Sequence, residues 1–220
     1  MLKFSPPDNN VKELLLPLCR DTISGTEAYT FLKLYENIPE GSFWCGKNEN
    51  GEIESLIFNN GDEDIKVFGS EFSELFLFSE KCLMIYENKT LPQSEAVEIE
   101  GNKLLDFYKL ISESDKLSFD NERRYVLRLR SVNKGLSKIF AVFLGEKLVS
   151  CAAISAVNEK YALIADVFTH PEYRKKGYAA KCVKTCVNYA LSQGKIPYLR
   201  CEEKMCDYYK KLGFSYYGKM

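Results

Sequence analysis

Residues 161–180 read YALIADVFTHPEYRKKGYAA, and this stretch decides how the second half of the chain folds. Ala162–Phe168 is an apolar run typical of a buried strand, and the turn that follows it contains Pro171. The basic run Arg174–Lys176 and then Gly177 lead into a long amphipathic helix. At such a helix N-terminus the free backbone N–H groups converge and the helix dipole favours negative charge. We therefore predict an anion-binding site at this turn.

Length and composition set broad limits on the protein. The 220 residues suffice for one large domain or two small ones. A hydrophobic content of 45% and a charged content of 28% are ordinary for a soluble globular protein. No apolar run approaches the roughly 20 residues that span a bilayer. The N-terminal sequence MLKFSPPDNN lacks the apolar region of a signal peptide. We expect a cytoplasmic protein that has no membrane partner.

The net charge of −1 conceals an asymmetry along the chain. Residues 1–134 carry 16 Lys and Arg against 24 Asp and Glu, whereas residues 135–220 carry 14 against 7. The even total argues against general nucleic-acid binding, while the basic second part suits a small polyanionic ligand. An equally acceptable interpretation is that the two parts attract each other. The acidic first part also raises the hypothesis that the substrate is cationic.

The eight cysteines do not suggest a disulfide framework or a metal site. Cys182 and Cys186 lie four positions apart and Cys201 and Cys206 five, so neither pair is a CxxC motif, and His170 is the only histidine. We expect reduced, buried thiols and no bound metal.

The periodicity of apolar residues, together with glycines and prolines, divides the chain into helices and strands. In the first hundred residues it predicts helices near 11–18, 26–37 and 70–78 and strands near 42–45, 53–58, 64–68, 82–86 and 96–100. In the remainder it predicts helices near 101–112, 120–132, 177–192 and 204–211 and strands near 139–144, 148–157, 162–168, 197–202 and 214–217. This order indicates a mixed α/β fold with two domains, residues 1–100 and residues 101–220.

A faint internal repeat connects the two parts. Phe43–Phe68 and Ile139–Phe168 share the order strand, turn, strand, turn, strand, and strand 82–86 would then match strand 197–202. The first part carries no basic turn after Phe68, where the sequence continues Gly-Ser-Glu. If the chain is a tandem, we expect only the second part to bind the anion.

A second motif follows the anion site about 30 residues later. YYKKLGF occupies residues 208–214, after one more predicted strand. In order and spacing, VFTHPEYRKKGYA and YYKKLGF resemble the acyl-CoA motif and the C-terminal motif of the GNAT superfamily of N-acetyltransferases. The resemblance covers about residues 120–220. It implies a mixed sheet whose fourth and fifth strands splay apart with acetyl-CoA in the gap, preceded by an N-terminal half that is a candidate degenerate copy of the same fold.

The resemblance also implies roles for individual residues. Backbone groups of three strand residues would contact the pantetheine and the thioester: Val167, Phe168 and Thr169. The turn and helix start would cradle the pyrophosphate: Arg174, Lys175, Lys176, Gly177, Tyr178, Ala179 and Ala180. A backbone N–H of the splayed strand would stabilise the tetrahedral oxyanion, and one such donor contributes on the order of 3 kcal/mol.

Tyr209 matches the tyrosine of the family that protonates the departing CoA thiolate, although it could instead pack as one more aromatic residue on an amphipathic helix. A phenol with a pKa near ~10 keeps its proton at neutral pH and can act as that acid. The family often has asparagine seven residues earlier, where this chain has Glu202. Glu202 could serve as a base instead. Asp166 is the first candidate for the base that deprotonates the amine; the alternative is a polar residue at the sheet edge.

We therefore expect an enzyme that moves an acetyl group from acetyl-CoA directly to the amine of a small molecule or peptide, through a tetrahedral intermediate. A module that binds acyl-CoA and regulates without catalysis is the alternative, and an acyl group longer than acetyl is a weaker one. The acceptor and the oligomeric state have no signature in the sequence.

Overall fold

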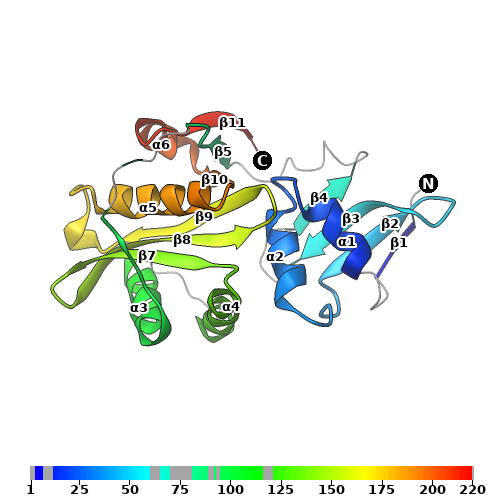
Figure 1. Cartoon of the computed structure of the whole chain (residues 1–220), viewed down its shortest axis with the longest axis horizontal. Coiled ribbons are helices and arrows are strands. Elements are labelled where there is room, and N and C mark those ends of the chain that lie inside the picture. The colour runs from blue at the N-terminus through cyan, green and yellow to red at the C-terminus, as the bar shows by residue number, and fades with distance from the viewer. Residues whose placement is uncertain are drawn as a thin grey trace.

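A computed structural model describes residues 3–6, 12–59, 65–69, 81–88, 92, 95–115 and 121–219 (Figure 1). The predicted helix at 70–78 lies outside these ranges, as does Asp120, the first residue of the helix predicted at 120–132. The described part divides between two sheets, one of four strands and one of seven.

The four-stranded sheet belongs to the N-terminal half. Its elements are β1 (Lys3–Ser5), α1 (Lys12–Cys19), α2 (Thr26–Leu34), β2 (Phe43–Lys47), β3 (Ile53–Asn59) and β4 (Ile65–Gly69). The strands lie in the order β1-β2-β3-β4, and every neighbouring pair is antiparallel. The two helices bury Leu15 and Leu32 against Phe43, Leu56 and Phe58 of the sheet. Each of these five side chains is at most 1% exposed, so this half has its own core.

The seven-stranded sheet forms the core of the C-terminal half. Its strands run in the order β11-β5-β10-β9-β8-β7-β6. The strands are β5 (Cys82–Ile85), β6 (Val97–Glu98), β7 (Lys138–Leu144), β8 (Lys147–Val157), β9 (Tyr161–Thr169), β10 (Ile196–Cys201) and β11 (Ser215–Lys219). The helices are α3 (Leu104–Asp115), α4 (Asn121–Asn133), α5 (Tyr178–Ser192) and α6 (Cys206–Lys211), with short 3₁₀ turns η2 (Gly101–Lys103), η3 (Pro171–Tyr173) and η4 (Glu203–Met205). The predicted mixed α/β class is confirmed.

Helices cover both faces of this sheet. Figure 1 shows α5 on one face and α3 and α4 on the other. On the α5 face Cys182 and Val187 pack against Ile164 and Leu199 of the central strands. Because side chains alternate along a strand, Leu163 and Tyr198 point to the opposite face. The two faces of β9 and β10 therefore pack against different parts of the protein, one against α5 and the other on the side away from α5.

The two halves repeat the same order of elements. The N-terminal half runs strand, two helices, three antiparallel strands (β1, α1, α2, β2, β3, β4), and the C-terminal half does the same (β6, α3, α4, β7, β8, β9). In both sheets these four strands are neighbours in chain order. The repeat predicted from residues 43–68 and 139–168 thus extends over a further strand and two helices on its N-terminal side.

Strand β5 corrects one part of the predicted domain division. Residues 82–86 were assigned to the N-terminal domain, but β5 lies between β10 and β11 and pairs antiparallel with both. Met84 stands opposite Leu199 on one side and Tyr216 on the other, and its side chain is fully buried. Pairing between strands so far apart in the chain leaves no local signal in the sequence, because any short apolar run can occupy such a position in a sheet. By sheet membership, the C-terminal half begins before residue 100.

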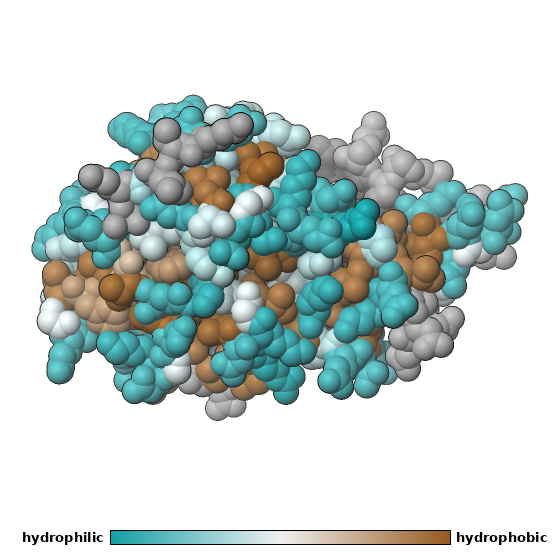
Figure 2. Space-filling view, in the orientation of Figure 1, coloured by the Kyte–Doolittle hydropathy of each residue, from teal (hydrophilic) through white to brown (hydrophobic). Residues whose placement is uncertain are grey.

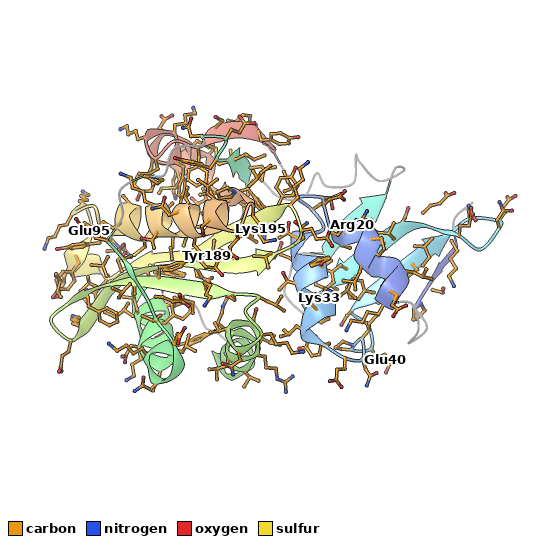
Figure 3. All side chains as sticks on the ribbon, viewed as in Figure 1. Arg20, Lys33, Glu40, Glu95, Tyr189 and Lys195 are labelled. Atoms are coloured by element: carbon orange, nitrogen blue, oxygen red, sulfur yellow. The ribbon has the colours of Figure 1, made fainter. Side chains whose placement is uncertain are left out.

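The turn between β8 and β9 joins the halves. Glu159 N donates to Arg20 O at 2.7 Å, and Lys195 donates to the carbonyl oxygens of Asn158 and Glu159. Arg20 and Lys195 are labelled at this junction in Figure 3. Thr30 of α2 also exchanges hydrogen bonds with the backbone of Val157. The N-terminal half is therefore hydrogen-bonded to the end of the sheet at which β9 begins.

The surface facing the viewer in Figure 2 is mostly hydrophilic, with apolar side chains in separate patches. None of the helices in the described part of the chain is long and apolar enough to span a bilayer.

Candidate active site

Strands β9 and β10 separate half-way along β9. Their parallel pairing runs from Ile196 opposite Tyr161 to Leu199 opposite Ile164 and then stops, although both strands continue. The side chains of Ala162–Ile164 are buried, whereas those from Ala165 to Thr169 are only partly buried. The predicted splay between the fourth and fifth strands of this half is confirmed. Beyond Ile164 the backbone of β9 is no longer paired with β10.

A β-bulge lies just past this point. Cys151 of β8 pairs with Phe168, and Ala153 pairs with Ala165, so one residue of β8 faces two of β9, Asp166 and Val167. Asp166 has a φ of 52°, a left-handed conformation that is uncommon for a residue other than glycine and that aspartate tolerates better than most. Strain of this kind persists only where neighbouring contacts hold it.

Arg128 of α4 supplies such a contact. Its Nη2 is hydrogen-bonded to Oδ2 of Asp166, forming an ion pair whose side chains are 17% and 28% exposed. Its Nη1 donates to Oγ of Ser137 at 2.9 Å and to the carbonyl oxygen of Ser155 at 3.3 Å. The guanidinium is therefore fixed between β7, β8 and the bulge. Asp166, our first candidate base, carries an ion pair in this state, which the sequence did not suggest.

The turn after β9 is braced by its own side chains. His170 caps η3 by accepting a hydrogen bond at Nδ1 from Glu172 N at 3.3 Å, and its ring contacts Tyr173 edge-on. Arg174 Nε donates to Thr169 O at 3.1 Å. Ser150 Oγ donates to Phe168 O at 2.9 Å. The carbonyl groups of Phe168 and Thr169, expected to face the pantetheine, thus already take part in bonds within the protein.

The start of α5 has the features that an anion requires. Gly177 is the N-cap with φ 82°, and Lys175 just before it has φ 63°. The first intrahelical bond runs from Lys181 N to Gly177 O, so the N–H groups of residues 178–180 come before the helical ladder begins. The first turn contains no acidic residue, and Lys175 and Lys176 are exposed. A Cβ built on Gly177 would meet nothing within 4 Å, so the backbone there is open.

Further cations surround this turn. Lys147 and Lys176 lie 5.2 and 5.1 Å from the centre of the Tyr173 ring. Lys181, near the beginning of α5, forms an ion pair with Glu95, which Figure 3 shows at the end of the helix opposite Lys195. The predicted anion turn therefore lies at the end of the sheet remote from the N-terminal half.

Tyr209 lies on α6, in the core cluster that α5 shares with the sheet. It is 7% exposed, and its ring contacts Tyr208 and Phe214 at centroid distances of 5.1 and 5.9 Å. Burial raises the pKa of Tyr209 above its ordinary value, and Tyr208 adds to this effect. The phenol therefore keeps its proton at neutral pH, as a general acid must.

Glu202, the other candidate base, lies on the surface. It is exposed, precedes η4 and forms an ion pair with Lys204. The hydrogen bond from Lys204 lowers the pKa of Glu202. Both candidate carboxylates are paired with a cation, but Asp166 lies at the bulge beside the separation of β9 and β10, whereas Glu202 is on the surface, so its position favours Asp166.

Sequence patterns missed three residues that lie close to the splay. Arg128 and Ser150 belong to no motif, and their contacts are visible only once β7, β8 and β9 are assembled. Arg200 is the first residue of β10 beyond its last pair with β9, and it forms an ion pair with Glu27 of α2 at 2.9 Å. Glu27 and Arg200 lie 173 positions apart in the chain, which no local pattern connects.

The described residues offer little for a metal. No group of three or more His, Cys, Asp or Glu in the described ranges is arranged to hold one. All eight cysteines are buried free thiols.

The geometry agrees with a family comparison. The sequence profile described as the Acetyltransferase (GNAT) family matches residues 104–214, half of the chain. The chain belongs to this family. The GNAT match covers the strand, turn and helix of the anion site, and it ends at Phe214, the last residue of the YYKKLGF motif. No curated protein matches the chain in sequence.

Two solved GNAT structures share the fold over the full length of this chain, and a third shares it over part of the chain. A GNAT acetyltransferase from Colwellia psychrerythraea is 12% identical, with a TM-score of 0.67, and the alignment covers 100% of this chain and 97% of that one. A tandem GNAT protein from the clavulanic acid biosynthesis pathway is 11% identical, with a TM-score of 0.63 and coverage of 100% and 96%. A putative GNAT acetyltransferase from Novosphingobium aromaticivorans is 19% identical, with a TM-score of 0.52, over 64% of this chain and 60% of that one.

Proposed function

We propose that this GNAT protein transfers an acetyl group from acetyl-CoA to an amine, using a single site in its C-terminal half. One observation carries the proposal: β9 loses its pairing with β10 after Ile164 and then leads to the basic turn at the start of α5, while Tyr209 is buried in the same cluster as Leu199 and Cys201 of β10. This arrangement matches a ligand with a phosphate group at one end and a reactive thioester at the other.

The open N–H groups at the start of α5 and the cations of the turn support binding of the pyrophosphate there. Arg174 closes the turn onto Thr169, while Lys175 and Lys176 remain exposed and add positive charge. The pantetheine would then run along the open edge of β9, with Val167–Thr169 as its neighbours. Acetyl-CoA supplies the activated acetyl group when it is bound.

The transfer balances when it starts from the ammonium form of the acceptor. The ammonium group loses one proton to a base, its nitrogen forms a bond to the acetyl carbon, and the nitrogen loses a second proton as the bond from that carbon to sulfur breaks. Tyr209 gives its proton to the departing thiolate and is later reprotonated from solvent. The net products are an N-acetylated acceptor, CoA and one proton. A backbone N–H group of the splayed strand would stabilise the oxyanion, which contributes on the order of 3 kcal/mol.

We propose Asp166 as the base, acting directly or through water. Among the described residues only Arg128 is hydrogen-bonded to its carboxylate, through Oδ2. Arg128 would hold the bulge and the carboxylate in place, which makes it a positioning residue.

A substitution pair tests the enzymatic role. Tyr209→Phe removes the acid and keeps the buried ring, so we expect kcat to fall about 10²- to 10⁴-fold while the Kd for acetyl-CoA stays unchanged. Tyr208→Phe is the matched control on the same helix and should keep most of the activity. Thiol release measured over a broad panel of amines provides the readout. Binding of acetyl-CoA without turnover on any amine would favour the regulatory module instead.

A further inference from the structure

Four charged side chains alternate in sign where β9 and β10 separate. In order across the sheet they are Arg128 on α4, Asp166 on β9, Arg200 on β10 and Glu27 on α2. All four are partly exposed, between 17% and 28% of each side chain. They lie on the sheet face opposite α5, because Arg200 has the same strand parity as Tyr198 and because Asp166 reaches α4.

The two middle charges belong to the two strands that border the gap. Extending the parallel register by one step would place Arg200 opposite Ala165, next to Asp166. Adjacent strands lie about 4.8 Å apart where they are paired, and farther apart beyond the splay. Asp166 and Arg200 therefore lie at neighbouring register positions on the two sides of the gap, and each forms an ion pair with a helix on its own side.

We infer that this row of charges selects an amino acid as the acceptor, with the ammonium group at Asp166 and the carboxylate at Arg200. This inference rests on the proposed acetyl transfer. The two charged groups of an α-amino acid are separated by a single carbon atom, which suits recognition by two adjacent strands. Since the proposed pyrophosphate site is at the start of α5, the pantetheine would approach from the α5 side, and the acceptor would approach from the opposite face, which carries these charges.

Charge balance favours a zwitterion over the other classes of amine. A diamine or polyamine would bring a second cation towards Arg200 or Arg128, and an acceptor with a phosphate group would bring an anion towards Asp166 and Glu27. Such like-charge contacts lower affinity, whereas complementary pairs fix orientation. This replaces the broader hypothesis of a cationic substrate, which rested on the acidic excess of the first 134 residues.

Both halves of the chain would contribute to this site. Glu27 belongs to the N-terminal half, and it orients Arg200 through the 2.9 Å ion pair. Tyr198, two residues earlier on β10, also donates to Ile23 O at 3.1 Å. The N-terminal half would thus determine which acceptor is used by a site that lies in the other half.

A matched substrate series tests the inference on the native chain. Thiol release from acetyl-CoA is measured with several amino acids, with their carboxamides and with the corresponding decarboxylated amines. We expect kcat/KM to be at least tenfold higher for the free amino acids. Equal or better turnover of the amides or amines would overturn the inference and leave the acetyl transfer intact. Turnover of none of the three series, with acetyl-CoA bound, would overturn the proposed function itself.

A charge swap separates binding from a purely structural role. Glu27→Arg combined with Arg200→Glu keeps an ion pair between α2 and β10 but places a carboxylate beside Asp166. We expect the preference for amino acids over their amides to disappear while acetyl-CoA binding persists. An unchanged preference would show that the pair only attaches α2 to the sheet. Arg130→Met, at an exposed position of α4, is the control and should leave the preference unchanged.

Discussion

Asn158 donates a hydrogen bond from Nδ2 to the carbonyl oxygen of Cys19 at 2.9 Å, across the junction of the two halves. The same amide donates to Thr22 O at 2.7 Å, and its Oδ1 accepts from the N–H groups of Lys160 and Tyr161. Asn158 is 1% exposed; its bond to Cys19 O is buried and the other three bonds are partly buried. One side chain thereby fixes both the β8–β9 turn and the end of α1.

We expect Asn158→Ala to lower the free energy of unfolding by about 2–4 kcal/mol, because it removes all four hydrogen bonds of this buried side chain, including the buried one to the Cys19 carbonyl. The control is Asn48→Ala in the β2–β3 turn, where Oδ1 accepts two comparable backbone bonds near the surface. That variant should cost less than about 1 kcal/mol. Urea unfolding of both variants measures the difference, and equal losses would mean that the junction bonds add little.

The position of β5 in the sheet predicts which strands a core cavity would destabilise. Met84→Ala should cost about 2–5 kcal/mol, as should Leu56→Ala in the N-terminal core, because both side chains are fully buried. Hydrogen exchange should then rise in β10 and β11 for Met84→Ala and in β2 and β3 for Leu56→Ala. Faster exchange in β2 and β3 of the Met84 variant, with β10 unchanged, would assign β5 to the N-terminal half after all.

Most local features of this fold were predictable, and the long-range ones were not. Residues 161–192 show their strand, turn and helix in the apolar pattern, Pro171 and Gly177, because each depends on neighbours along the chain. The partners of β5 and of Asp166 depend on residues far away in sequence. By its sequence, β5 (Cys82–Ile85) could complete either sheet. Nothing in the sequence near Asp166 indicates Arg128, which lies 38 positions earlier.

Buried thiols should make the protein sensitive to alkali. Burial raises the pKa of Cys19 and of Cys182 from 9.0 to about 12. Between these values the unfolded chain has lost the thiol proton and the folded chain still holds it, so stability is complete below pH 9 and falls as the pH rises towards 12. Each thiol should contribute a slope of up to about 1.4 kcal/mol per pH unit.

The corresponding measurement compares Cys182→Ala with the native chain. We expect the difference in unfolding free energy between the two to shrink steadily from pH 9 to 11, because the variant no longer carries the thiol that ionises on unfolding. Lysine and tyrosine residues titrate in the same range, but their effects are common to both proteins and cancel. Parallel stability curves would contradict the burial effect.

The basic turn should be the only acetyl-CoA site of the chain. Gly177 and Gly194 flank α5, have φ values of 82° and 68°, and leave open space for a Cβ. Alanine at either position should therefore cost a similar 1–2 kcal/mol of backbone strain. Only Gly177→Ala should weaken acetyl-CoA binding, because only that glycine belongs to the turn expected to hold the pyrophosphate.

Calorimetric titration of the whole chain with acetyl-CoA tests this assignment most directly. We expect one molecule bound per chain, at least tenfold weaker binding for Gly177→Ala, and native affinity for Gly194→Ala. Two molecules per chain would mean that the N-terminal half also binds the cofactor. Native affinity in the Gly177 variant would mean that the turn from Arg174 to Gly177 is not the pyrophosphate site.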